Sequence, residues 1–170
     1  MIEKNCELTI DELFKRVFEI ELTSAKVYIK LAELFSHVSE VSTFWDDLAK
    51  EEKHHEETLQ EIYKSLTQEQ LLSPTDKNIM LKTVEIQNLL NKDLINPIKN
   101  LDDAYELAHQ LEYCEVESIF KFLVTKVVPS EKRKSFILSE LNEHQKKLMV
   151  FSEKFGNASW RKQVTTRSGG

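Results

Sequence analysis

Residues that break helices are almost absent from this chain, and their scarcity limits the folds open to it more than any other feature. Only 3 Gly and 3 Pro occur among its 170 residues. Helix interiors disfavour both, Gly because of its backbone freedom and Pro because it lacks an amide hydrogen and clashes with the preceding turn. No alternating pattern typical of strands is found. The sequence therefore predicts an all-α fold built from long helices.

Turn signals divide the sequence into four long helices and one helical connection. Serine-rich or proline-containing clusters separate the segments, Ser42 or Thr43 is expected to cap the second helix, and Gly156 suits the position just after the last one. The predicted long helices span residues 9–38, 42–66, 101–127 and 131–155, and the connecting helix spans 76–95. Two helix pairs joined by a longer crossover predict an antiparallel four-helix bundle over residues 1–156, followed by a disordered basic tail at 157–170.

Composition narrows the class of protein further. The length fits one domain, and 41% hydrophobic with 31% charged residues is typical of a globular chain. The apolar runs are too short to span a membrane, and the first residues lack the apolar stretch of a secretory signal, so a cytoplasmic location is expected. A net charge of −6 argues against nucleic-acid binding. The cysteines, Cys6 and Cys114, form no CxxC pair and fit a reducing compartment.

Acidic and histidine residues interrupt the apolar faces of the long helices near their midpoints. In steps of three and four, the apolar face of the second helix contains Glu52 and His55 next to one another, with apolar residues before and after them. Each of the other three helices has a similar interruption. The residues concerned are Glu21, Glu52, His55, Glu112, Glu115, Glu140 and His144.

A metal site accounts for charged residues at such positions. An isolated buried carboxylate is strongly unfavourable, so a core position that holds Glu beside His needs a compensating cation. In an antiparallel bundle the midpoints of the helices meet at one level, where carboxylates and Glu-x-x-His motifs can bind two metal ions. Carboxylate and imidazole ligands suit iron. The sequence therefore predicts a site for two non-haem iron ions, with zinc or manganese as alternatives.

One segment resembles a known family. Residues 48–59, LAKEEKHHEETL, are similar to the second-helix motif of the rubrerythrin group in the ferritin-like superfamily. Glu21, followed by Ala25 and Tyr28, resembles that family's first-helix ligand segment, and residues 104–108 resemble the start of its third helix. The resemblance covers about residues 9–155. It implies a ferritin-like bundle with Glu21, Glu52, His55 and Glu112 as ligands, and Glu115, Glu140 and His144 completing the set.

The fourth helix departs from the family pattern. The family's Glu-x-x-His would place Glu at position 141, where this chain has Leu141, although His144 keeps the histidine position. Glu140 could supply the missing acid through its i, i+4 relation to His144, or Glu140 could act together with Glu143. The site is therefore expected to be asymmetric, or to bind one metal firmly and another weakly.

The resemblance also implies an activity. Rubrerythrin-like proteins oxidise ferrous iron with hydrogen peroxide or oxygen, which implies a role in peroxide defence or iron handling. No rubredoxin-type segment occurs in these residues, so a separate electron-donor protein is expected. A homodimer is expected by default, without nucleic-acid or membrane partners. Two alternatives stay open: an iron-binding or storage protein with little turnover, and a helical scaffold that has lost its metal site, which Leu141 favours.

Overall fold

The structure, a computed structural model, describes residues 8–112 and 117–167, and this part of the chain is all-α, as predicted. No β-strand occurs within these ranges, where the extended pairing is limited to isolated bridges. The helices described are α1 (Ile10–Leu34), α2 (Ser39–Lys64), α3 (Gln68–Leu72), α4 (Lys77–Leu90), α5 (Leu101–Leu111), α6 (Glu117–Val127), α7 (Glu131–Lys154) and α8 (Ala158–Gln163).

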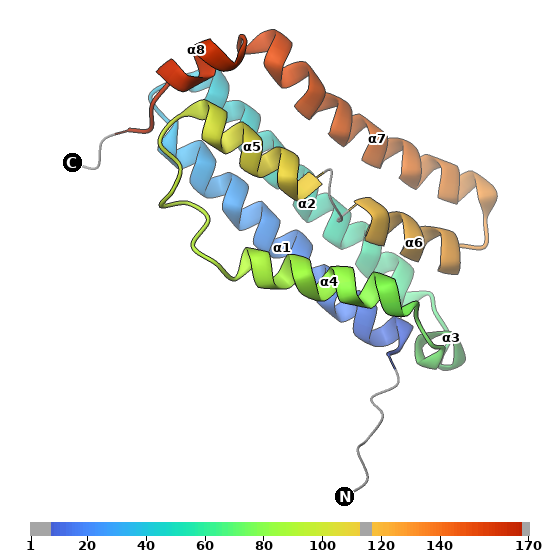
Figure 1. Ribbon diagram of the computed structural model, residues 1–170. Helices are drawn as coiled ribbons and strands as arrows, with labels where there is room; N and C mark the ends of the chain where they lie inside the picture. Colours follow the sequence, from blue (N-terminus) through green and yellow to red (C-terminus); the bar gives the residue numbers. More distant parts are fainter. Residues whose placement is uncertain (1–7, 113–116, 168–170) are drawn as a thin grey trace, which may run out of the picture.

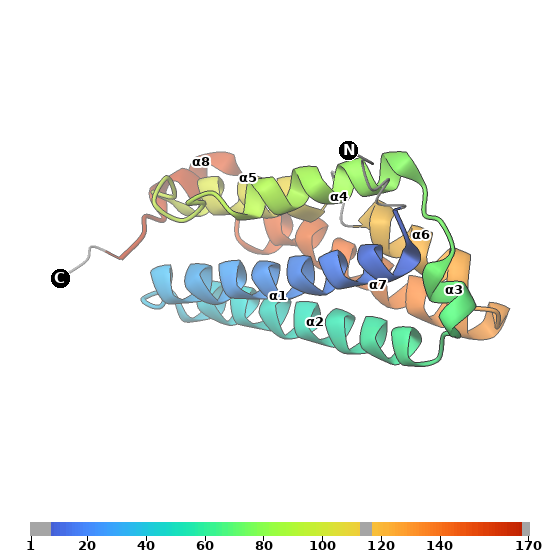
Figure 2. The same cartoon turned by 90° about the horizontal axis from the view of Figure 1, so that it is seen from below.

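The long helices lie side by side along the molecule (Figures 1 and 2). α1 and α2 form an antiparallel pair, and α1 also packs against α4 and α6. α5 and α6 follow one another in one direction, and α7 returns antiparallel to them, in contact with α6 (Figure 1). The segment that contains α4 connects the first pair of helices to the second.

Local capping explains where several helices begin and end. The Thr9 side chain accepts from the backbone of Glu12 and the Glu12 carboxylate accepts from the backbone of Thr9, so Thr9 caps the start of α1. Asn100 starts α5 in the same reciprocal manner. Gly156 follows α7 with φ +81°, a left-handed conformation that favours glycine, and so confirms the predicted stop.

Other boundaries differ from the prediction. α1 ends at Leu34 rather than residue 38, and α2 begins at Ser39, ahead of the predicted caps Ser42 and Thr43. Ser42 lies inside α2, and its hydroxyl donates to the Ala32 carbonyl oxygen of α1, 2.9 Å away. The short helix α3, which Thr67 caps, was not predicted. The single helix predicted at 101–127 is described as α5 and α6, and residues 113–116 between them lie outside the described ranges.

The chain after α7 also differs from the prediction. Residues 157–170 were predicted as a disordered tail, but Ala158–Gln163 form α8, which packs against α5. Arg161 is buried there; its Nε donates to Asp102 Oδ1 at 3.0 Å, and its guanidinium lies 4.6 Å from the centre of the Tyr105 ring. The composition of this segment suggested disorder. It could not reveal the ion pair with Asp102, because that residue lies far away in the sequence.

The core contains the apolar faces that the sequence predicts for the long helices. On α2 the positions from Val41 to Ile62 in steps of three and four are buried, as are those on α7 from Ile137 to Phe155. The largest fully buried side chains include Trp45, Tyr28 and Phe14. Across the described ranges, no helix is both long enough and apolar enough to cross a membrane.

Replacing Arg161 with alanine tests whether α8 belongs to the folded unit. We expect Arg161→Ala to lower the free energy of unfolding by about 3 kcal/mol, because it leaves the Asp102 carboxylate without its partner. Urea denaturation followed by circular dichroism measures the change. Lys162→Ala, an exposed neighbour on the same helix, is the matched control and should have little effect. Equal stability of the two variants would contradict this account of α8.

Candidate metal centre

A cluster of acidic and histidine side chains lies inside the core, surrounded by apolar residues. Glu21 comes from α1, Glu52 and His55 from α2, Glu112 from the C-terminal end of α5, and His144 from α7. All five are buried, and Glu21 is completely inaccessible to solvent. The structure thus brings together five of the seven residues that the sequence proposes as ligands.

Glu52 lies between the two histidines. Its Oε1 atom is 3.0 Å from His144 Nε2, and its Oε2 atom is 3.6 Å from His55 Nδ1. Glu112 and Glu21 complete the cluster, since Glu112 Oε1 is 3.1 Å from His144 Nε2 and Glu21 Oε2 is 3.7 Å from His55 Nδ1. One ligand atom from each of Glu52, His55 and His144 lies within 4.8 Å of the others, a spacing that a metal ion could bridge.

Several buried polar atoms of this cluster have no hydrogen-bond partner within the part of the chain that the structure describes. They include both carboxylate oxygens of Glu21, Oε1 of Glu52 and Nε2 of His144. The last two atoms approach each other closely, but they are not aligned for a hydrogen bond. A buried polar group without a partner costs about 1–3 kcal/mol, and folded proteins keep few of them. Carboxylate oxygens and an imidazole nitrogen that face one another without hydrogen bonds could instead act as ligand atoms for a hard or borderline metal cation.

The protonation of the metal-free cluster follows from burial and mutual charge. Burial, together with the nearby Glu52 carboxylate, raises the pKa of Glu21 well above its usual value. Burial also tends to raise the pKa of Glu52, but the positive charge of His144 and the contacts with His144, His55 and Glu21 together outweigh that effect and lower it. Although burial disfavours its charged form, contacts with Glu21 and Glu52 raise the pKa of His55 to about 10. Without a metal, protons therefore supply the positive charge that the carboxylates require.

Tyr28 holds one of the carboxylates in position. Its hydroxyl donates a hydrogen bond to Glu112 Oε1 at 2.5 Å, and its ring stacks on Trp45 with centroids 6.0 Å apart. Burial and the neighbouring Glu112 carboxylate raise the pKa of the Tyr28 phenol, so the hydroxyl stays protonated and remains a donor. Tyr28 thus connects α1 to the C-terminal end of α5 across the site.

Glu51 is a functional candidate that the sequence interpretation missed, because it does not lie on the apolar face of α2 that contains Glu52 and His55. Its Oε2 atom is 2.7 Å from His144 Nδ1, and its other oxygen contacts Lys147 Nζ of α7. Its side chain is 24% exposed. With Nδ1 occupied by Glu51, the Nε2 atom of His144 is left facing Glu52 and Glu112. The only sequence signal was its place beside Glu52 in the second-helix motif.

One predicted ligand, Glu140, does not lie in the cluster. Glu140 was predicted to share a face with His144, but it lies at the surface with Oε1 3.7 Å from His54 Nε2. The inward position one turn before His144 is taken by Leu141, which is buried. Glu143, the other acid considered with Glu140, is exposed and pairs with Lys146. Glu115 lies outside the described residues.

Comparison with known proteins does not place the chain in a family. No family model matches it, and neither curated proteins nor solved structures show a significant similarity to it. The assignment of a metal centre therefore rests on the chemistry and geometry of the residues themselves.

Removing Glu51 tests its role in orienting His144. We expect Glu51→Ala to weaken metal binding about 10- to 100-fold, because the imidazole loses the acceptor that holds its Nδ1. Competition titrations of Co²⁺ and Zn²⁺ against a chromophoric chelator measure the affinity. Glu57→Ala, an exposed carboxylate on the same helix, is the matched control. If both variants bind metal like the unaltered protein, Glu51 does not position His144.

The raised histidine pKa predicts how the metal-free protein responds to pH. A group whose pKa is higher in the folded than in the unfolded protein contributes its full stabilisation at pH values below the unfolded-state pKa. That contribution is lost as the pH rises through the folded-state pKa. For His55 this range runs from 6.5 to about 10. We expect the free energy of unfolding of the metal-free protein to fall across this range and to fall less in His55→Gln. Urea denaturation at a series of pH values measures both curves; coincident pH dependences would count against the ionic cluster.

Proposed function

We propose that the protein is a ferritin-like metalloprotein whose buried Glu/His cluster binds iron and oxidises ferrous iron with hydrogen peroxide or oxygen, as a rubrerythrin does. The observation that carries this proposal is the convergence of Glu21, Glu52, His55, Glu112 and His144, from four separate helical elements, on one point inside the core. Few structural reasons lead to five ionisable groups buried together, three of which have side-chain atoms without a hydrogen-bond partner among the described residues.

The helix arrangement supports a ferritin-like four-helix bundle. α1 and α2 form one antiparallel pair, α5 with α6 and α7 form the second, and a long segment with α4 connects the two pairs (Figure 1). Ferritin-like bundles have one such long crossover and carry their metal ligands on the inward faces of the helices. The five clustered residues occupy inward positions of this kind.

In the proposed centre, Glu52 would lie between two metal positions. One position would be formed with Glu21 and His55, and the other with Glu112 and His144. Iron bound there would supply the electrons that reduce peroxide or oxygen. The chain itself orients the ligands: Tyr28 donates to Glu112, and Glu51 accepts from His144. The Phe120 ring, centred 5.6 Å from that of His55, helps to exclude water.

The location, the oligomeric state and the electron donor of the protein are also part of the proposal. We infer a cytoplasmic protein that acts as a homodimer and receives electrons from a separate donor protein. Zinc or manganese could occupy the same oxygen and nitrogen ligands, so the identity of the metal is part of the proposal.

A second candidate is an iron-binding protein with one firm metal position and little turnover. Leu141 favours it, because this buried side chain stands where the family pattern has an acid, and Glu140 does not replace it. Among the described residues, α7 therefore contributes a histidine but no carboxylate to the cluster.

Metal loading and peroxide consumption test the proposal together. Anaerobic loading with ferrous iron should give about two iron ions per chain by elemental mass spectrometry, and the loaded protein should consume hydrogen peroxide. Glu52→Ala should lose both properties because it removes the carboxylate shared by the two positions. Glu56→Ala is the matched control, since Glu56 is also buried on α2 but accepts from Gln60 outside the cluster.

The possible outcomes separate the two candidates. One iron per chain without peroxide consumption would favour the binding protein. No bound iron after anaerobic loading would rule out both and leave a helical scaffold.

A further inference from the structure

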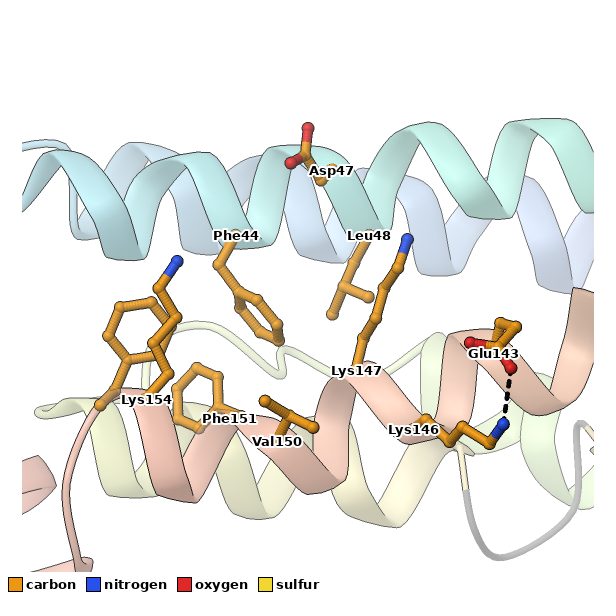
Figure 3. Close-up of a pocket in the computed structure, with 10 residues that line it drawn as sticks. Phe44, Asp47, Leu48, Glu143, Lys146, Lys147, Val150, Phe151 and Lys154 are labelled. Atoms are coloured by element: carbon orange, nitrogen blue, oxygen red, sulfur yellow. Dashed lines mark hydrogen bonds and ion pairs between the residues drawn. The ribbon is translucent and has the colours of Figure 1, made fainter.

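A second potential binding site lies between α2 and α7, outside the metal cluster (Figure 3). It is a groove with a volume of about 420 Å³, within the range of small-molecule sites. Its floor consists of Phe44 and Leu48 from α2 and of Phe151 and Phe155 from α7. Val150, which is 50% exposed, stands at its edge. We refer to it as the α2–α7 groove.

The floor of the groove is a compact aromatic surface. The ring centroids of Phe44 and Phe151 are 4.6 Å apart, and Phe155 lies 5.8 Å from the first and 5.0 Å from the second. Phe151, Phe155 and Leu48 are almost fully buried by the protein, so their positions are set by core packing. A rigid apolar surface of this kind suits a hydrocarbon chain or an aromatic ring.

The charged residues around the groove are mostly neutralised by partners. Lys146 pairs with Glu143 at 2.6 Å, Lys147 contacts Glu51, and Asp47 pairs with Lys50 at 3.2 Å. Figure 3 shows the Lys146–Glu143 pair at one end of the groove and Lys154 at the opposite end.

Lys154 differs from these residues. Its Nζ lies 5.3 Å from the centre of the Phe155 ring, and no described carboxylate is within ion-pair distance of it. The groove therefore combines an apolar floor with one uncompensated positive charge at its aromatic end.

From this combination we infer that the α2–α7 groove binds a small amphipathic anion, such as a medium-chain carboxylate. The hydrocarbon part would lie on Phe44, Leu48 and Phe151, and the carboxylate would pair with Lys154. Burial of apolar surface supplies most of the affinity, and the cation selects the sign of the head group. A neutral molecule of the same shape lacks the ion pair, and a cationic one is repelled by Lys154.

The inference does not depend on a bound metal. One contact between the groove and the surroundings of the cluster is that of Lys147 with the Glu51 that accepts from His144. None of the five clustered residues lines the groove. Ligand binding can therefore be measured on metal-free protein, and its failure would leave the metal proposal intact.

The test compares three ligands of equal chain length with the full-length protein. Decanoate, decanol and decyltrimethylammonium are titrated by calorimetry below their micellar concentrations. We expect decanoate to bind most tightly and the cationic compound most weakly. Lys154→Glu should weaken decanoate binding about ten-fold, because it replaces attraction by repulsion at the head group. Lys132→Glu makes the same charge reversal at an exposed position on α7 away from the groove and should leave binding unchanged.

Val150→Trp provides an independent check of the location. Because Val150 is half exposed, the substitution should leave the fold intact while the larger side chain fills part of the groove and weakens decanoate binding.

Three results would overturn the proposal: equal binding of decanoate and decanol, equal effects of the two lysine reversals, or no binding at all. A change of oligomeric state in Val150→Trp, measured by native mass spectrometry, would also overturn it and would assign this face to contact between copies of the chain.

Discussion

The contact of Glu52 with two histidines is the interaction on which the rest of this structure depends. A carboxylate in the core is unfavourable unless positive charge lies next to it. His55 comes from the same helix, one turn later, but His144 comes from α7, so the charge requirement of Glu52 is met only when α2 and α7 approach closely. The buried charges therefore constrain the tertiary arrangement in addition to the apolar residues around them.

Side chains outside the cluster fix the directions in which its atoms point. Tyr28 and Glu51 each form one hydrogen bond to a cluster residue, and each comes from a different helix than the residue it holds. Buried polar networks of this type give geometric definition when every member has a partner. Here Glu112 Oε1 and His144 Nδ1 have such partners, whereas both oxygens of Glu21 and Oε1 of Glu52 have no hydrogen-bond partner among the described residues, a pattern that fits a cation site.

The packing of α2 against α7 also connects the two proposed sites. His144 and Lys147 lie one turn apart on α7, the first at the metal cluster and the second at the α2–α7 groove, and Glu51 of α2 contacts both. A ligand that displaced Lys147 would change the charge next to Glu51. The two sites are nevertheless built from different residues. The metal cluster consists of carboxylates and imidazoles, whereas the floor of the α2–α7 groove is mainly aromatic, so the two sites would bind different kinds of ligand.

The sequence by itself determined the all-α class, most of the helical segments and five of the clustered residues, because apolar periodicity and helix caps are local properties. The tertiary structure alone decided that Glu51 rather than Glu140 faces His144, and that Arg161 anchors α8 to α5. Those outcomes depend on how α7 is rotated against α2 and on an ion pair between residues 59 positions apart. A helical repeat shows which side chains share a face, but the partner of that face is set by packing between helices.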